Sequence, residues 1–477
     1  MDSCTANPSG EGRACGRVDR AGRRWACLVS GLCLVLLACG AGCSAVQTTG
    51  GDGHFHAVEI FPRTADHVHG STVVELPNGD LLAAWFQGSG ERWADDVAIM
   101  GARLPRGRRT WSQPFLMADA PGFPDINPIL FLDGRQRLWL MWYAVIANQW
   151  ETSLVKYRIS TDYDGQGPPV WAWQEVLHVK PGDPAERGIQ PGDRFVRSVE
   201  RQVEAYGEYL LELARLHEFG TADEVHTAWQ EWSRQLLAKA RGEDMVRKGI
   251  LVDSAGQRVE AILGYPYFRR MGWQTKNKAV LLDGRRLIVP LYSDGFSFSL
   301  MAITDDGGRT WQFSEPLVAA GNIQPSIARR ADGTLVAYMR DNGPPPQRLH
   351  VSASADGGLT WSPVRDGELP NPGSGADIVT LADGHWVLAY NDTEQGRRRL
   401  AVSLSRDEGK TWPFTRYLEN DSREVSVATR SHYPSIIQGR GGELHVVYSY
   451  HHNDQPGAPA KTIKYARFDE AWILAAP

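Results

Sequence analysis

The feature that most constrains this chain is a β-hairpin pattern that recurs six times, about fifty residues apart. Each copy has an apolar strand, a turn that carries glycine and a second apolar or alternating strand. Asn-Gly and Asp-Gly turns are strong hairpin signals because such turns need positive φ angles. The copies cover Val73–Phe86, Ile129–Tyr143, Ala279–Tyr292, Ser326–Arg340, Ile378–Asp392 and Ser435–Tyr450. This period predicts an all-β, six-bladed β-propeller with about four strands in each blade.

A second repeat, of the form S/T-x-D-x-G-x-T-W, is interleaved with the hairpins. It occurs at Thr304–Trp311, Ser354–Trp361 and Ser405–Trp412, with eroded copies ending at Trp111 and spanning Ser160–Trp171. We expect its Asp to accept backbone N–H bonds across a tight turn, and its Gly to take a positive φ. We expect its Trp to pack between blades. This motif is structural and names no reaction.

One segment, residues 193–248, breaks the β pattern because its apolar residues follow a helical period. One apolar stripe runs from Phe195 to Leu216 and another from Val225 to Leu237, with Gly220 between them. The pattern predicts a two-helix hairpin inserted after the second blade. Such a hairpin can serve as a packing brace, or as a lid over the active face.

Composition narrows the classes of partner. The 477 residues carry a formal net charge of -5, which argues against a nucleic-acid ligand. The 17 tryptophans mildly favour a glycan partner, because indole rings stack on sugars. All six cysteines lie at or before residue 43, so the folded body has no disulfide, thiol nucleophile or cysteine metal ligand.

The N-terminus explains the position of the cysteines. Five arginines precede the apolar run Trp25–Ala38, a layout that is typical of a signal peptide. Leu36-Leu37-Ala38-Cys39 resembles a bacterial lipobox, which would make Cys39 the lipidated first residue; the alternative is simple cleavage near Ala41 or Ala45. We therefore expect an exported protein, either an envelope lipoprotein held to the membrane only by this anchor or a secreted one. The expected parts are a signal peptide (1–38), a flexible tether (39–54) and a propeller (55–473) that contains the helical insertion (193–248).

The S/T-x-D-x-G-x-T-W repeats look like the Asp-box of sialidase-type propellers. Together with the segments around residues 69–99, 322–343, 371–397 and 432–450, they resemble the bacterial "predicted neuraminidase" branch of the sialidase superfamily, over roughly residues 55–473. The resemblance implies an exo-acting glycoside hydrolase that releases a terminal acidic sugar. Sialidases use a Tyr nucleophile activated by Glu, an Asp acid/base and three arginines that clamp the substrate carboxylate.

Residue by residue, the resemblance makes Tyr433 the nucleophile, because it begins the sixth hairpin. It makes Asp95 or Asp96, on the loop after the first hairpin, the acid/base. Arg340 falls at the second-arginine position. One of three consecutive arginines, Arg397, Arg398 and Arg399, falls at the third. The remaining two of those three are expected to be surface charges.

Two positions depart from the family pattern. His69 stands where the first arginine is expected, and Gln324 stands where the activating Glu is expected. Gln can orient a phenol but cannot accept its proton, so these departures favour a relative that acts on a different sugar. His67 and His69 face the same side of a strand and form a possible metal pair. No third ligand is evident, so neither a metal nor a cofactor is predicted.

Other polar residues at the ends of the inner strands are candidates for the same face of the ring. We expect Asn277 and Asp377 to contact substrate. Further candidates at equivalent places are Lys276, Tyr292, Asp294, Arg348 and Asn391.

Two alternatives to a hydrolase remain. One is a non-catalytic glycan-binding lipoprotein, which the departures at His69 and Gln324 favour. The other is a polysaccharide lyase in which His69 is the base and Tyr433 the acid. A lyase leaves an unsaturated uronate that absorbs ultraviolet light, whereas a hydrolase does not.

Overall fold

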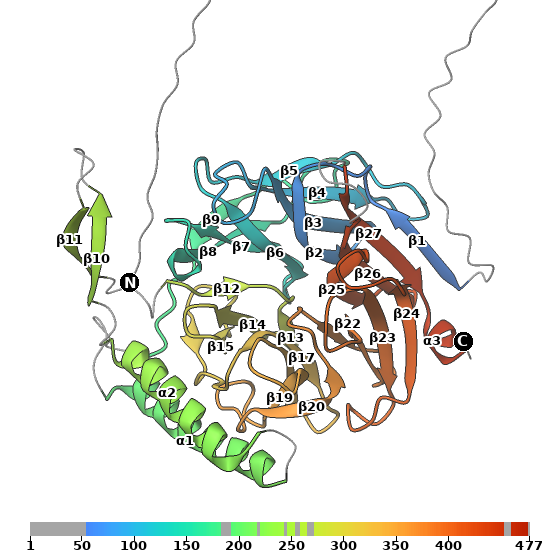
Figure 1. Ribbon diagram of the computed structural model, residues 1–477. Coiled ribbons are helices and arrows are strands. Elements are labelled where there is room, and N and C mark those ends of the chain that lie inside the picture. Colours follow the sequence, from blue (N-terminus) through green and yellow to red (C-terminus); the bar gives the residue numbers. More distant parts are fainter. Residues whose placement is uncertain are drawn as a thin grey trace, which may run out of the picture. The chain divides into compact units, whose positions relative to one another are not determined.

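Six antiparallel blades form a ring (Figure 1), as the hairpin period predicts; five have four strands and the third has five. The computed structural model describes residues 54–182, 192–216, 220–242, 271–452 and 459–475, and the backbone of 246–252 and 258–264. The signal peptide, Cys39 and nearly all of the tether lie outside these residues, so export and lipidation stay predictions. No helix within the described ranges is long and apolar enough to cross a membrane.

The first three blades are built from consecutive strands. Blade 1 comprises β2 (His67–Glu75), β3 (Leu81–Gly88), β4 (Ala98–Leu104) and β5 (Phe115–Ala118). Blade 2 comprises β6 (Asp125–Leu132), β7 (Leu138–Val145), β8 (Ser153–Ser160) and β9 (Trp173–Val176), with the short 3-10 helix η1 (Trp150–Thr152) before β8. Blade 3 comprises β12 (Gln274–Thr275), β13 (Val280–Leu282), β14 (Arg286–Ser293), β15 (Phe298–Thr304) and β16 (Gln312–Phe313). Its innermost strand is interrupted, because both β12 and β13 pair with β14.

The last three blades continue the pattern until the ring closes. Blade 4 comprises β17 (Asn322–Arg329), β18 (Leu335–Asp341), β19 (Arg348–Ser354) and β20 (Arg365–Pro370). Blade 5 comprises β21 (Asp377–Thr380), β22 (Trp386–Asn391), β23 (Arg399–Ser405) and β24 (Phe414–Asn420). Blade 6 comprises β25 (Arg430–Gln438), β26 (Leu444–His451), β27 (Lys461–Phe468) and, from the other end of the chain, β1 (Phe55–Glu59). The short helix α3 (Glu470–Leu474) follows β27.

The Asp-box turns lie between the third and fourth strands of blades 3, 4 and 5 and have the expected hydrogen bonds. The Asp306 carboxylate accepts bonds from the backbone N–H groups of Arg309 and Thr310 and from the Thr310 hydroxyl, at 2.6–3.0 Å. Gly308 has a φ of +89°, so the turn needs glycine there. Trp311 packs edge-on against Trp139 of blade 2, which ties neighbouring blades together.

The insertion forms the predicted helical hairpin, α1 (Arg194–Arg215) and α2 (Ala222–Arg241). Asp193 caps α1, and Thr221 with Glu224 forms a capping box at the start of α2. The helical pattern runs too far at its C-terminal end, because residues 246–248 belong to β10 (Val246–Val252), which pairs with β11 (Arg258–Gly264). Gly242 takes the left-handed conformation that ends α2.

The helical hairpin is anchored to the outer parts of blades 3 and 4. The Gln202 side chain bonds the backbone of Pro316 and Val318. The Tyr209 hydroxyl donates to the Asp366 carboxylate at 3.2 Å in blade 4. These contacts favour the packing brace over the lid.

Candidate functional site

Four innermost strands share one backbone irregularity. In β2, β6, β17 and β25 the pairing register shifts. Each shift contains a residue with positive φ: Gly70 (64°), Asn127 (46°), Gln324 (57°) and Tyr433 (55°). Proline follows the last three of these residues, and a bulge is where a strand tolerates a proline that cannot donate to the ladder.

The bulges bring Tyr433 and Gln324 together, although 109 positions separate them. Gln324 Nε2 donates a hydrogen bond to the Tyr433 hydroxyl at 3.0 Å, and Arg340 Nη1, from β18, donates another at 2.8 Å. Arg340 Nη2 is held by Asn342 Oδ1 at 2.9 Å. The Tyr433 oxygen therefore faces two donors, one of them charged.

Two further tyrosines extend this network. Asn127 Nδ2 donates to the hydroxyls of Tyr143 and Tyr292 at 3.2 and 3.3 Å, and Gln324 Nε2 lies 3.4 Å from the Tyr292 hydroxyl. Burial raises the pKa of Tyr143 and Tyr292 well above the ordinary value, so both stay neutral phenols. Sequence reasoning missed Asn127, although Asn127-Pro128 matches Gln324-Pro325 and Tyr433-Pro434 in its hairpin position.

Two more cations flank the Tyr433 ring. Arg397 Cζ lies 5.5 Å from the ring centre and Lys276 Nζ lies 5.3 Å from it, and Arg397 Nη2 donates to the Gly373 carbonyl. Burial lowers the pKa of Lys276 to about 8, against the attraction of the Asp377 carboxylate. These two cations and Arg340 gather three positive charges around one phenol.

Glycines create the space for this cluster. A Cβ at Gly70 would lie 2.3 Å from Asn127 Oδ1, so only glycine fits there. A Cβ at Gly375 would lie 3.0 Å from Gln324 Oε1 and 3.3 Å from Lys276 Cε. At these two glycines the centre of the ring therefore has no room for an added methyl group beside its polar side chains.

Two carboxyl groups that sequence reasoning passed over for catalysis lie beside the arginines. Burial raises the pKa of Glu91, and the charges of Arg92, Arg397 and Arg340 oppose that rise. Burial also raises the pKa of Asp294, again opposed by Arg340. The Asp294 charge raises the pKa of Glu91, and the Arg340 charge lowers the pKa of both carboxyl groups, so both lie within electrostatic reach of the Tyr433 cluster. Glu91 stands on the loop where an acid/base was predicted, four and five positions before Asp95 and Asp96.

The structure places the two predicted acid/base residues elsewhere on that loop. Asp95 is exposed and accepts a bond from Asn148 Nδ2 at 3.4 Å. Asp96 is exposed and caps the loop by accepting bonds from the Ser89 backbone and hydroxyl, which lower its pKa. A group with a lowered pKa is poorly suited to donate a proton.

Two of the predicted substrate contacts, Asn277 and Asp377, also make bonds inside or between blades. Asn277 Nδ2 donates to the Gln324 and Pro325 carbonyls and so fixes the bulge of β17. The Asp377 carboxylate accepts bonds from Ser326, Lys278 and the Ile436 backbone, which joins blades 3 to 6. Arg399 begins β23 with its side chain near Tyr417, and Arg398 bonds the backbone of residues 422 and 423. Of the three consecutive arginines, Arg397 is the one beside Tyr433.

His69 lies against Tyr433, with ring centres 4.1 Å apart. Burial lowers the pKa of His69 well below the ordinary value, so the imidazole is neutral. His432 and His451 lie beside it, and one ring nitrogen of each of the three lies within 4.8 Å of the others. Of the His67–His69 pair considered from the sequence, only His69 belongs to this group; its partners are two histidines of blade 6, which no sequence motif indicated.

Comparisons with known proteins agree with this architecture. The family model for the BNR repeat-like domain matches residues 79–187 and 271–446. A sialidase of Micromonospora viridifaciens is 28% identical over 180 residues, which are 36% of this chain and 25% of that protein. The aligned region thus spans about a quarter of that relative.

Solved structures show the same fold at low identity. A Hadza microbial sialidase has a TM-score of 0.55 at 14% identity, covering 88% of this chain and 69% of that one. The intramolecular trans-sialidase of Ruminococcus gnavus has a TM-score of 0.52 at 15% identity, covering 88% of this chain and 98% of that one.

Proposed function

Because the chain belongs to the BNR repeat-like family of the sialidase superfamily, we propose that it is an exo-acting glycoside hydrolase that releases a terminal acidic sugar, sialic acid or a relative of it. The observation that carries this proposal is the Tyr433 hydroxyl, held by Arg340 and Gln324 between the cations Arg397 and Lys276. A phenol at the centre of such a cluster suits attack on an anomeric carbon that bears a carboxylate, because a neutral nucleophile avoids like-charge repulsion.

Recognition of the acidic group falls to Arg340 and Arg397. The planar fork of a guanidinium can bind a carboxylate through two parallel hydrogen bonds. Arg340 Nε is buried and has no partner among the described residues, so this fork retains bonding capacity for a ligand. His69 puts a neutral ring where the family has its first arginine, which favours a sugar whose acidic group needs fewer charged contacts.

Glu91 and Asp294 supply the two carboxyl groups that the proton transfers require. Protonation of the leaving oxygen needs an acid that is still protonated near neutral pH, and burial moves the pKa of Glu91 in that direction. Gln324 donates to Tyr433 and orients it, so the phenol proton must pass to another group. Asp294, with its own raised pKa, is the second candidate for proton transfer.

The test combines a panel of acidic glycosides with Tyr433→Phe. We expect release of a monosaccharide from at least one panel member, and a loss of turnover of at least about 1,000-fold in Tyr433→Phe. The matched control is Tyr338→Phe, whose hydroxyl contacts the Gly409 carbonyl near an Asp-box turn and should leave turnover unchanged. Equal turnover in both variants would rule out Tyr433 as the nucleophile.

One observation favours a polysaccharide lyase as the second candidate. The neutral His69 ring packs against Tyr433, and neither of the hydrogen bonds described for the Tyr433 hydroxyl involves a carboxylate. A base and an acid at that separation suit proton abstraction next to a uronate carboxylate. Ultraviolet absorbance of the product separates the two candidates, because the lyase product contains a new double bond.

A further inference from the structure

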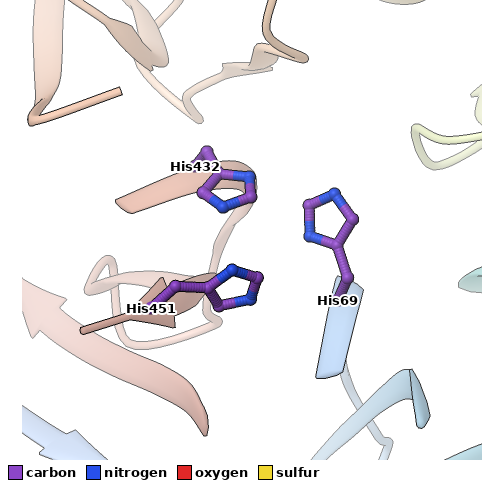
Figure 2. Close-up of side chains that lie close together, drawn as sticks. All are labelled: His69, His432 and His451. Carbon is purple, nitrogen blue, oxygen red and sulfur yellow. The ribbon is translucent and has the colours of Figure 1, made fainter. Parts of the chain in front are cut away.

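Three buried histidines meet where blade 1 adjoins blade 6, and their rings face one another (Figure 2). His69 comes from β2, His432 from β25 and His451 from β26. The ring centre of His432 lies 4.6 Å from that of His69 and 4.8 Å from that of His451. The hydrolase proposal gives none of these three imidazoles a catalytic step, so their clustering needs its own explanation.

In two of the three rings one nitrogen is already hydrogen-bonded. His451 Nε2 lies 2.7 Å from the Val68 carbonyl, which can only accept, so Nε2 carries the proton and Nδ1 keeps its lone pair. His69 Nδ1 lies 2.7 Å from the Ser449 hydroxyl. Metal-binding histidines are usually oriented in this way, with the second ring nitrogen bonded to a carbonyl or another polar group.

The third ring has an unsatisfied nitrogen. His432 is 4% exposed, and its Nε2 is buried without a partner among the described residues. Its Nδ1 accepts from Arg397 Nη1 at 3.2 Å, which keeps the proton on Nε2 while the site is empty. Binding a metal through Nε2 would move the proton to Nδ1 and break this one bond. Arg397 would stay anchored through Nη2 to Gly373.

The ligand set restricts the class of metal. All three ligands are imidazole nitrogens of side chains that are at most 6% exposed. Neutral imidazoles suit zinc, copper, nickel and cobalt, whereas calcium and magnesium prefer oxygen ligands.

The surrounding charge restricts the fourth ligand. The Arg397 guanidinium lies against His432, with Nη1 at 3.2 Å from Nδ1, so a positive charge adjoins this cluster. A divalent cation here is favoured only together with an anionic ligand, such as hydroxide or the acidic group of a bound sugar. Three protein ligands leave a coordination position for that anion.

We propose that His69, His432 and His451 form a transition-metal site of the zinc class, with a fourth position open to an anion. This inference goes beyond the proposed hydrolase and does not depend on it. The site lies between the first and last blades of the ring, and one of its ligands, His432, directly precedes Tyr433 in the sequence.

The experiment is a titration of chelator-treated protein with Co²⁺, followed by visible absorbance, and with Zn²⁺, followed by calorimetry. The full chain is used without a histidine tag, and its six cysteines are first alkylated because thiolates also bind these metals. We expect one Co²⁺ per chain, with the visible bands of a four-coordinate site, and displacement of Co²⁺ by Zn²⁺.

Variants then assign the ligands. His451→Gln and His432→Gln should each weaken metal binding by at least about 100-fold. His445→Gln is the matched control, because His445 is also a buried blade 6 histidine but bonds the Tyr465 hydroxyl outside the cluster. Far-ultraviolet circular dichroism checks that each variant folds. Absence of stoichiometric binding in the alkylated parent, or equal affinity in His445→Gln and either ligand variant that folds, would overturn the proposal.

Discussion

The Asp-box turns at the edge of the blades and the bulged strands at the centre of the ring are both repeats, but they differ in what repeats. At the turns the side chains recur: Asp306, Asp356 and Asp407 each accept a hydroxyl bond at 2.6 Å from a threonine four positions on. At the centre only the backbone recurs. The same positive-φ bulge presents Gly70, Asn127, Gln324 or Tyr433 in different blades.

The two regions also differ in how far their polar atoms are satisfied. Each Asp-box carboxylate is bonded within its own turn, whereas Gln324 Oε1, Asn127 Oδ1 and Arg340 Nε are buried without partners among the described residues. Buried polar atoms are normally paired, so a concentration of unpaired ones is a sign of a ligand site. The polar groups of the turns therefore stabilise the turns themselves, whereas unpaired polar atoms at the centre of the ring are free to bind a ligand.

The largest effect that tests this contrast is expected at the centre. Arg340→Ala removes a bond to Tyr433 and one fork for an acidic group, so kcat/KM should fall about 100-fold, or ~2.7 kcal/mol. The melting temperature should change little. Arg399→Ala is the matched control and should change kcat/KM less than about twofold, because its side chain lies near Tyr417. A larger loss of kcat/KM in Arg399→Ala than in Arg340→Ala would assign recognition of the acidic group to Arg399 and not to Arg340.

A smaller effect is expected from pH. Lys276 has a pKa of about 8, so it is positively charged below pH 8 and loses its charge as the pH rises through that value. Affinity for an acidic inhibitor should therefore weaken about tenfold between pH 7 and pH 9. Lys276→Met should bind more weakly at pH 7 and show a flat profile over this range. If the affinity of the parent protein is equally independent of pH, Lys276 does not contribute to recognition of the acidic group.

The smallest effect is expected at the rim. Asp306→Ala removes four bonds of one turn and should lower the free energy of unfolding by about 1–2 kcal/mol without changing kcat. Hydrogen bonds lower the pKa of Asp306 in the folded state, so its contribution is present above the unfolded pKa, near 4, and is lost as pH falls below it. Denaturant unfolding at pH 7 and pH 3 measures this difference. A loss of turnover in Asp306→Ala would contradict the claim that the Asp-box turns contribute to stability and not to catalysis.

The same contrast explains what could be predicted. The six blades and the helical insertion follow from periods and turn residues, which are local properties of the chain. The sequence also predicts that Tyr433, Gln324 and Arg340 lie on one face of the ring, because each keeps a fixed place in its hairpin. Their contacts at 2.8 and 3.0 Å show that they meet as the ring geometry requires.

The remaining site residues depend on burial and on packing between blades. The loop after β3 offers Glu91, Asp95 and Asp96, and only the folded structure shows that Glu91 is the carboxyl that interacts electrostatically with Arg340 and Arg397. Likewise, strand alternation pairs His67 with His69 but cannot reveal that His432 and His451 arrive from another blade. Asn127 is the exception, because its Asn-Pro step carried a usable signal.

The closure of the ring by β1 sets the order in which the chain can complete its fold. Phe55 pairs with Phe468 and Glu59 with Lys464, so the last blade gains its fourth strand only after the whole propeller sequence is available. Pairing of segments so distant in sequence is slow, because the entropy of closing the loop comes before the reward of the contacts. Until then β27 presents an open edge on which a β1 strand from a second chain can add. From this late closure we expect strand exchange between nascent chains to compete with closure of the ring.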